Sequence, residues 1–267
     1  MTGAALTACV AILAAAISGA AQTPSAPRRV SAPISFYDDA DPTEPGVLSA
    51  SASVSYNRVD AGHDFDGPSA YLSLGLHKRL ELSADLGRAD SLFEETRISG
   101  IADSYLAAKL LVVPEGRRRP ALALKPMLEI LGPASIHEDV LAPGRVNFVP
   151  SFILQKSFDN YRVYYMGGYV TRGILFQSLA GELNLWSRLT PTVILSTARV
   201  TREVALISDL GLNRSRADAT GSVTIMLTPR WSVFASGGRS FGRPDMNSSR
   251  YAFSGGATFH FRLWGEK

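Results

Sequence analysis

The feature that most constrains this chain is an alternation of apolar and polar side chains with a period of two residues, which begins at Val47. From residue 48 to residue 57, Leu, Ala, Ala, Val and Tyr alternate with four serines and an Asn. The pattern recurs up to the closing stretch at 253–262. Successive side chains of a β-strand point to opposite faces, so this period predicts strands with one apolar and one polar face. After Val47 no stretch shows the helical spacing of about 3.6 residues, and the chain is predicted to be all-β.

The connections between the predicted strands alternate in length. The tight connections lie at 77–79, 156–160, 187–191 and 228–230, with a slightly longer one at 113–119. Longer polar stretches lie between them, at 58–68, 87–99, 132–145, 201–216 and 241–250, while the link at 171–176 is short. Outer-membrane barrels have short turns at one end, longer loops at the other, and an even number of strands, here about twelve. The apolar stretch from Val204 to Leu212 gives an alternative of about fourteen strands, because it could add one more strand pair.

The alternation alone does not decide which face points inward. A soluble barrel has an apolar lumen, and a membrane barrel has the opposite arrangement. The strand number is too large for side chains to fill the lumen, and aromatic residues lie near strand ends on the apolar face, as an interfacial girdle requires. These aromatics are Tyr56, Phe148, Tyr161, Trp231 and Phe261. We therefore predict a transmembrane antiparallel up-and-down β-barrel over residues 47–264, in the outer membrane of a Gram-negative bacterium.

An apolar segment at the N-terminus supports export. Residues 4–21 carry no charge and end in small residues, which predicts a signal peptide over residues 1–21 that is cleaved after Ala21. The alternatives are a membrane anchor, for which the run is short, and lipidation at Cys9, after which the chain stays apolar. Cys9 is the single cysteine, so a cleaved chain has no disulfide and no thiolate metal site.

Residues 22–46 separate the signal peptide from the first predicted strand. They contain five prolines and three aspartates. Such a composition disfavours regular structure, so we expect a flexible periplasmic segment. The alternative is a plug that enters the barrel.

With the polar face inward, a set of charged side chains is predicted to line the lumen. These residues are Glu81, Asp85, Asp103, Lys109, Lys125, Glu129, Arg162, Glu182 and Arg262. A charge that is removed from bulk water must be paired or stay hydrated. Their mixed signs favour a narrow, partly ion-paired interior over an open filter of one sign.

Several other functions are disfavoured by the sequence. The formal net charge is only +3 and the longest basic run is Arg117–Arg119, which does not indicate a nucleic-acid partner. The histidines are His63, His77, His137 and His260, and none has a serine at a spacing that suggests a catalytic pair. Since no metal-ligand spacing occurs either, we expect no catalytic residues, no metal and no cofactor.

Four stretches, in order, carry a resemblance to a known family. Gly100-Ile101-Ala102-Asp103 with Leu106-Ala107-Ala108-Lys109 resembles a Gly-x-Gly-Asp…Lys strand. The other three stretches are Pro120–Leu124, the turns at Leu189-Thr190-Pro191 and Leu227–Trp231, and the closing strand Phe253–Phe261. Over most of residues 47–263 the chain thereby resembles the outer-membrane transporter family of the MetA-pathway of phenol degradation. Two departures from the family pattern occur. Ala102 stands in place of the second Gly. Barrel chains usually end on an aromatic residue, but here six residues follow Phe261, and Trp264 is the alternative terminal aromatic.

The resemblance implies a barrel that takes up small hydrophobic or aromatic compounds. Our first hypothesis is therefore a channel or transporter for passive passage of such solutes. The second is a structural or adhesive surface barrel with a closed lumen, and the third is a lipid-modifying barrel enzyme. The expected partners are outer-membrane lipid, the barrel-insertion machinery acting through the C-terminal strand, and a small-molecule solute whose identity the sequence leaves open.

Overall fold

The computed structural model describes residues 37–59, 62–93, 96–134, 145–185, 188–201, 213–242 and 248–264. The predicted signal peptide, residues 22–36, His137 and the stretch from Val204 to Leu212 lie outside these ranges. No helix in the described ranges is long and apolar enough to span a membrane.

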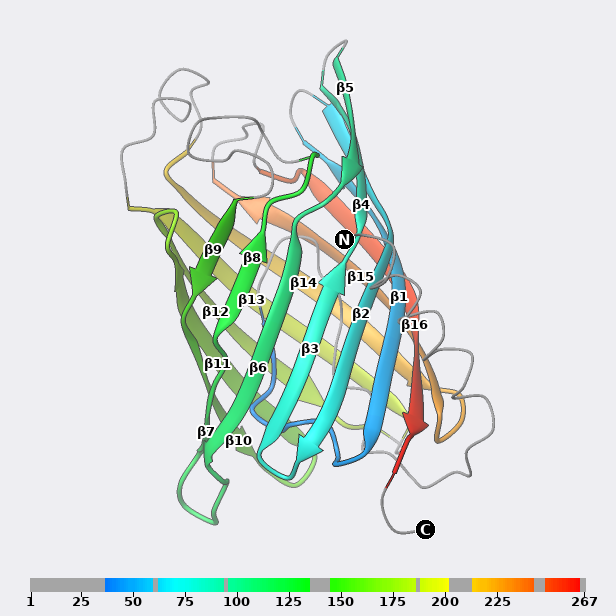
Figure 1. Ribbon diagram of the computed structural model, residues 1–267, viewed down its shortest axis with the longest axis vertical. Helices are drawn as coiled ribbons and strands as arrows, with labels where there is room; N and C mark the ends of the chain where they lie inside the picture. The colour runs from blue at the N-terminus through cyan, green and yellow to red at the C-terminus, as the bar shows by residue number, and fades with distance from the viewer. Residues whose placement is uncertain are drawn as a thin grey trace.

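All regular structure in the described residues is β-strand (Figure 1). The strands are β1 (Val47–Arg58), β2 (Gly62–His77), β3 (Leu80–Leu86), β4 (Arg88–Phe93), β5 (Thr96–Ile101), β6 (Ser104–Val113), β7 (Ala121–Leu124), β8 (Met127–Ile130), β9 (Val146–Val149), β10 (Ser151–Ser157), β11 (Tyr161–Val170), β12 (Ile174–Leu183), β13 (Leu189–Val200), β14 (Ser215–Met226), β15 (Trp231–Phe241) and β16 (Tyr251–Arg262).

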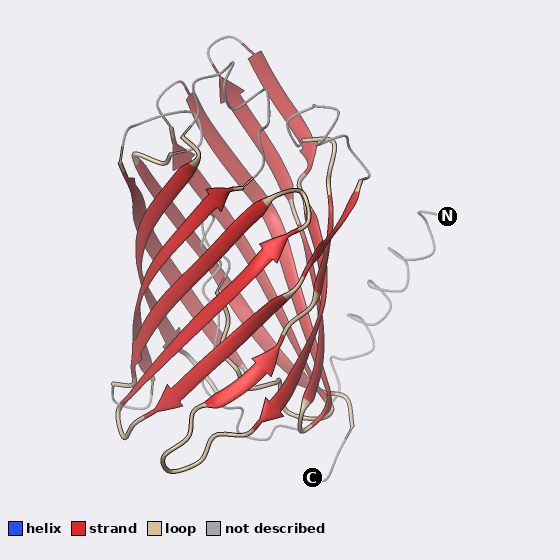
Figure 2. Cartoon of the chain, turned by 90° about the vertical axis from the view of Figure 1, so that its left-hand side faces the viewer, coloured by secondary structure: helices blue, strands red, loops and turns tan. Residues whose placement is uncertain are grey.

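These segments form one antiparallel sheet that closes into a barrel of twelve strands (Figure 2). Closure follows because β1 pairs with both β2 and the last strand, β16. Four barrel strands consist of two segments each, namely β3 with β4, β5 with β6, β7 with β8, and β9 with β10. The prediction of about twelve strands is confirmed. β13 pairs directly with β14 along its length, so no extra strand pair lies between them in the wall.

Two of the strand interruptions contain proline, which explains where they occur. Pro126 separates β7 from β8, and Pro150 separates β9 from β10. Proline has no backbone N–H to donate to a ladder, although its carbonyl still accepts. The Pro126 carbonyl accepts from the Ala108 N–H at 3.1 Å, and the Pro150 carbonyl accepts from the Tyr169 N–H at 3.1 Å. The wall therefore stays hydrogen-bonded across both breaks.

The outer face of the wall is apolar and the inner face is polar. Val193 is 59% exposed and Phe253 is 58% exposed, while the inward-facing Ser236 and Ser254 are buried. Trp231, a predicted girdle residue, is 49% exposed. A soluble barrel would show the reverse arrangement. The barrel is therefore of the transmembrane type, with an outer face that suits lipid.

Two stretches predicted as long loops are instead largely strand. β1 ends at Arg58 and β2 begins at Gly62, which places His63 in a strand rather than in a loop. β4 and β5 form a hairpin that extends beyond the rest of the wall at the loop end (Figure 1). These stretches lack the apolar face of a membrane-crossing strand. Strand pairing beyond the membrane needs no such face, because water solvates both sides of the hairpin.

Candidate functional site in the barrel lumen

Residues 37–45, here called the inner segment, lie inside the barrel before the chain enters the wall (Figure 1). Asp38 and Asp39 are 0% and 1% exposed. Gly46 follows the segment; its N–H donates to the Gly75 carbonyl at 2.8 Å, and its carbonyl accepts from the Leu263 N–H at 2.7 Å. The described part of residues 22–46 is thus fixed against the wall and the end of the last strand.

Two lysines from the wall hold the start of the inner segment. Lys109 on β6 contacts one carboxylate oxygen of Asp38 at 3.2 Å, and Lys125 contacts the other at 2.6 Å. Lys109 also contacts Asp39 at 3.3 Å and Glu81 at 3.5 Å. All five side chains are buried. Buried charges persist only when they are paired and hydrogen-bonded, and here each lysine lies against carboxylates of opposite sign.

Arg162 on β11 holds the next part of the segment. Its Nη1 atom contacts Asp39 at 3.3 Å and Asp41 at 3.4 Å. Its Nη2 atom donates to both carboxylate oxygens of Glu182 on β12, at 2.9 and 2.8 Å. Gln155 donates to Asp41 at 2.8 Å. The planar guanidinium suits such a site because it binds several carboxylate oxygens in fixed directions.

The end of the inner segment is held by contacts of two residues, Thr43 and Glu44. Thr43 donates to Glu81 from its backbone N–H at 2.8 Å and from its hydroxyl at 2.9 Å. Glu44 accepts from Arg262 at 2.9 Å, near the end of β16. The segment is therefore bound to several strands around the turn end of the barrel, and it lies within the lumen there.

A cavity of about 580 Å³ lies in the lumen, and its lining combines polar and apolar side chains. Tyr37 of the inner segment belongs to its lining. Hydroxyl and carboxyl groups from β1, β2 and β3 line one side, namely Ser51, Ser53, Ser55, Asp66, Ser83 and Asp85. Apolar side chains from β6, β8 and β11 to β13 form a patch elsewhere in the lining, namely Ala107, Met127, Met166, Ile174, Phe176 and Ala198. Polar groups, such as Lys125, Arg172, Ser178 and Ser196, also line this region.

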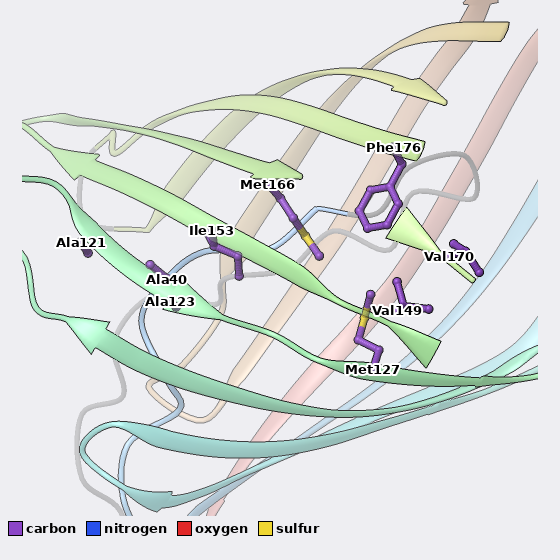
Figure 3. Close-up of a cluster of buried hydrophobic side chains, with 9 residues drawn as sticks. All are labelled: Ala40, Ala121, Ala123, Met127, Val149, Ile153, Met166, Val170 and Phe176. Atoms are coloured by element: carbon purple, nitrogen blue, oxygen red, sulfur yellow. The ribbon is translucent and has the colours of Figure 1, made fainter. Parts of the chain in front are cut away.

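The apolar patch continues into a cluster of buried side chains (Figure 3). Met166 and Phe176 are 2% and 4% exposed, and Ile153 and Val149 are fully buried beside them. Ala40 of the inner segment belongs to the same cluster. Apolar side chains therefore face into a membrane barrel whose remaining inner wall is rich in Ser and Thr.

The structure places the predicted lumen residues in three groups. Glu81, Lys109, Lys125, Arg162 and Glu182 surround the inner segment, and Arg262 lies at its end. Asp85 and Asp103 are half-buried in the cavity lining. Glu129 lies apart from the inner segment. The role of these residues in a transport path stays a prediction.

Glu129 belongs to a second polar cluster that the sequence did not reveal. Arg172 contacts it at 2.9 and 3.1 Å, Asn147 donates to it at 3.0 Å, and the Tyr105 hydroxyl donates at 2.9 Å. Arg172 lies in the short turn between β11 and β12. Its side chain was missed because turn residues do not follow the inward and outward alternation of strands.

The histidines are distributed over different parts of the fold. His63 faces outward on β2, where its ring stacks on Tyr56 at a centroid distance of 6.0 Å. The Nδ1 atom of His77 accepts from the Arg79 N–H in an exposed turn. His260 faces inward on β16. Within the described ranges, no group of three or more His, Cys, Asp or Glu is arranged to hold a metal ion.

Comparisons with known proteins identify the fold. No protein-family model matches the chain, and no curated protein matches its sequence. A solved outer membrane channel from Pseudomonas putida F1 matches with a TM-score of 0.65 and 12% identity, covering 85% of this chain and 100% of that chain. The KdgM porin in complex with disordered oligogalacturonate matches at 0.55 with 10% identity, covering 80% and 98%. LpxR from Salmonella typhimurium matches at 0.50 with 10% identity, covering 80% and 99%. At these identities the likeness establishes a shared outer-membrane barrel fold.

Proposed function

We propose that this chain is an outer-membrane channel through which small, largely apolar compounds pass without an energy source. The observation that carries the proposal is the cavity whose lining combines a patch of apolar side chains with hydroxyl and charged groups. Its volume of about 580 Å³ lies within the range of small-molecule sites. A compound with an aromatic body and a polar group, such as a phenol, matches both kinds of lining. The resemblance to the MetA-pathway transporter family supports the same class.

The apolar patch in the lining argues against a simple water-filled pore. Lumen-facing residues of porins are polar, because the channel holds water. Met166 and Phe176 are instead almost fully buried toward the lumen. Methionine is flexible and polarisable, and it adapts its shape to apolar partners of different outline. These properties suit a lining that accepts several related apolar compounds.

The inner segment supports a path that is closed at rest. Its carboxylates pair with Lys109, Lys125 and Arg162 across the lumen at the turn end. A solute that reaches the cavity from the loop end then meets this network before it can leave. Passage therefore requires the inner segment to shift. Deleting the segment would open the same path.

Uptake of phenylnaphthylamine by intact Gram-negative cells tests the proposal, because lipopolysaccharide slows the entry of this apolar fluorescent probe. Cells that express the chain should take it up faster than cells with an empty vector. Met127→Gln with Met166→Gln keeps the side-chain length but makes the lining polar, and we expect slower uptake. Met127→Leu with Met166→Leu is the matched control and should retain uptake. Equal uptake with and without the chain would refute the proposal.

The closed-lumen surface barrel is a second candidate, and the buried network around the inner segment favours it. A barrel of that kind needs no path through its interior. It would take up no probe in the uptake assay, whether its lining carries Met, Leu or Gln. Removing residues 22–45 would then leave uptake unchanged as well.

A further inference from the structure

Four arginines face outward at the loop end of the wall. They are Arg58 on β1, Arg88 on β4, Arg199 on β13 and Arg239 on β15. Residues directly opposite in an antiparallel pair share a face of the sheet. Arg88 lies opposite Ile101, Arg199 opposite Leu175 and Arg58 opposite Tyr251, and these partners are 59%, 50% and 44% exposed. The Arg239 guanidinium lies 5.6 Å from the ring centre of Phe241, which is 52% exposed.

The four arginines lie at the height where their strands leave the hydrocarbon. A tilted strand crosses a bilayer core in about 9–11 residues. Counted from the first residue of β15, Trp231, Arg239 is the ninth residue, and counted from Leu189 of β13, Arg199 is the eleventh. The outward-facing residues before them are mostly apolar or small, which fits the lipid core. The guanidinium groups therefore reach the headgroup level.

The arginines lie along one continuous run of seven of the twelve barrel strands. Following the sheet order, β4, β2, β1, β16, β15, β14 and β13 are consecutive neighbours. On the remaining strands, described outward-facing residues at the same end include Phe148 on β9, Tyr169 on β11 and Leu175 on β12. The exposed Arg97 on β5 is held by Asp90. An attraction to anions at this level is therefore one-sided.

Within the described ranges these four guanidinium groups have no ion-pair partner. Arg97 on β5 is held by Asp90, and Arg88 interacts with the same carboxylate at longer range. Arg88, Arg199 and Arg239 are exposed and Arg58 is half-buried. Exposed cations beside an apolar belt attract the anionic headgroups of lipids.

We propose that this set, the arginine arc, binds the phosphate groups of a phosphorylated glycolipid of the outer leaflet, of the lipid A class. Arg58 and Arg239 lie on either side of β16, about 10 Å apart laterally by strand spacing, and Tyr251 lies between them. Guanidinium groups bind phosphate oxygens through paired hydrogen bonds. The exposed rings of Tyr251 and Phe253 just below would contact the acyl chains. A free phosphate would lack that apolar contact, so the lipid is the favoured source.

Native mass spectrometry of the refolded chain, titrated with bisphosphorylated lipid A, tests this inference. We expect the Arg58→Gln, Arg239→Gln double variant to bind about tenfold more weakly than the parent. The matched control, Arg117→Gln with Arg119→Gln, removes the same charge from an exposed turn at the opposite end and should bind like the parent. Heat-modifiable gel migration verifies that each variant is folded.

A second arm varies the lipid and leaves the protein intact. Dephosphorylated lipid A and inorganic phosphate should each bind the parent chain much more weakly than bisphosphorylated lipid A. Equal binding of the phosphorylated and dephosphorylated lipids, or equal binding by the double variant and the control, would overturn the inference. Neither result would affect the proposed channel, since solute uptake is measured separately.

Discussion

The ammonium group of Lys125 donates to a carboxylate oxygen of Asp38 at 2.6 Å and joins the barrel wall to a residue 87 positions earlier in the chain. Lys109 contacts the other oxygen of the same carboxylate. Asp38 is fully buried, so this carboxylate serves as the shared anion of two wall lysines. The contact holds the inner segment in the lumen, and the first prediction depends on it.

Asp38→Asn should loosen the inner segment. The substitution leaves two buried lysines with one carboxylate fewer, and unpairing one member of such a site costs about 3–5 kcal/mol when the surroundings cannot relax. We expect the segment to leave the lumen before the barrel unfolds. In a chain that begins at residue 22 and therefore lacks Cys9, an Ala40→Cys probe should react with a water-soluble maleimide about tenfold faster in the Asp38→Asn background. Asp159→Asn, in an exposed turn, is the control and should leave the labelling rate unchanged.

Removing Arg162 should harm the barrel more than removing Glu182. Arg162 contacts Asp39, Asp41 and Glu182, so Arg162→Met leaves three carboxylates without that cation. Glu182→Gln deletes one of those three charges and keeps a hydrogen-bonding group. We expect a loss of about 3–5 kcal/mol for the first variant and about 1–3 kcal/mol for the second, read from urea unfolding in lipid. If both variants lose the same free energy of unfolding, the expected larger role of Arg162 is wrong.

Gly46 should not tolerate a side chain. Its φ is +77°, and a Cβ atom at this position would clash with the Trp264 carbonyl oxygen. Gly46→Ala therefore strains the backbone and pushes the C-terminal residues away, and we expect about 1–3 kcal/mol of destabilisation in the same unfolding assay. Gly221→Ala is the matched control, because nothing lies within 4 Å of the place that its Cβ atom would occupy. If the two variants unfold together, the contact between Gly46 and Trp264 does not contribute to stability.

The turn between β6 and β7 should loosen in acid. Burial alone would raise the pKa of Glu115, but hydrogen bonds from the Ser157 N–H, Lys156 and the Ser157 hydroxyl lower it below the usual 4.5. A carboxyl whose folded pKa is lowered stabilises the fold above the unfolded pKa, and this contribution is lost as the pH falls through the lower folded value. Amide exchange at Ser157 should therefore accelerate below about pH 4.5 beyond the intrinsic rate. Glu115→Gln should remove that acid dependence.

The barrel and its faces could be predicted because a strand gives each position a fixed side. Val193 and Phe253 share the apolar parity of their strands, while Lys109 and Arg162 take the other, so their sides follow from counting. The strand number followed from the alternation of turns and loops. The hairpin of β4 and β5 did not follow, because a strand outside the membrane needs no apolar face.

The site could be predicted only in part. The inward positions of Lys109 and Lys125 follow from parity, but their partner Asp38 lies in a Pro-rich stretch that has no periodicity. The proximity of three aspartates at 38, 39 and 41 to the first strand was the available hint of a partner for lumen cations. Arg172 gave no hint at all, since a turn residue is free to point either way. Long-range pairing is set by the closed barrel, and local sequence does not encode it.

In the proposed channel the inner segment closes the lumen, and planar-bilayer conductance tests this closure most directly. The chain refolded from residue 22 should conduct little, and the chain without residues 22–45 should show steps several times larger. Asp38→Asn should fall between them, with more frequent openings. If the shortened chain, shown to be folded by heat-modifiable migration, conducts no more than the parent and takes up no apolar probe, the barrel is not a channel of this kind.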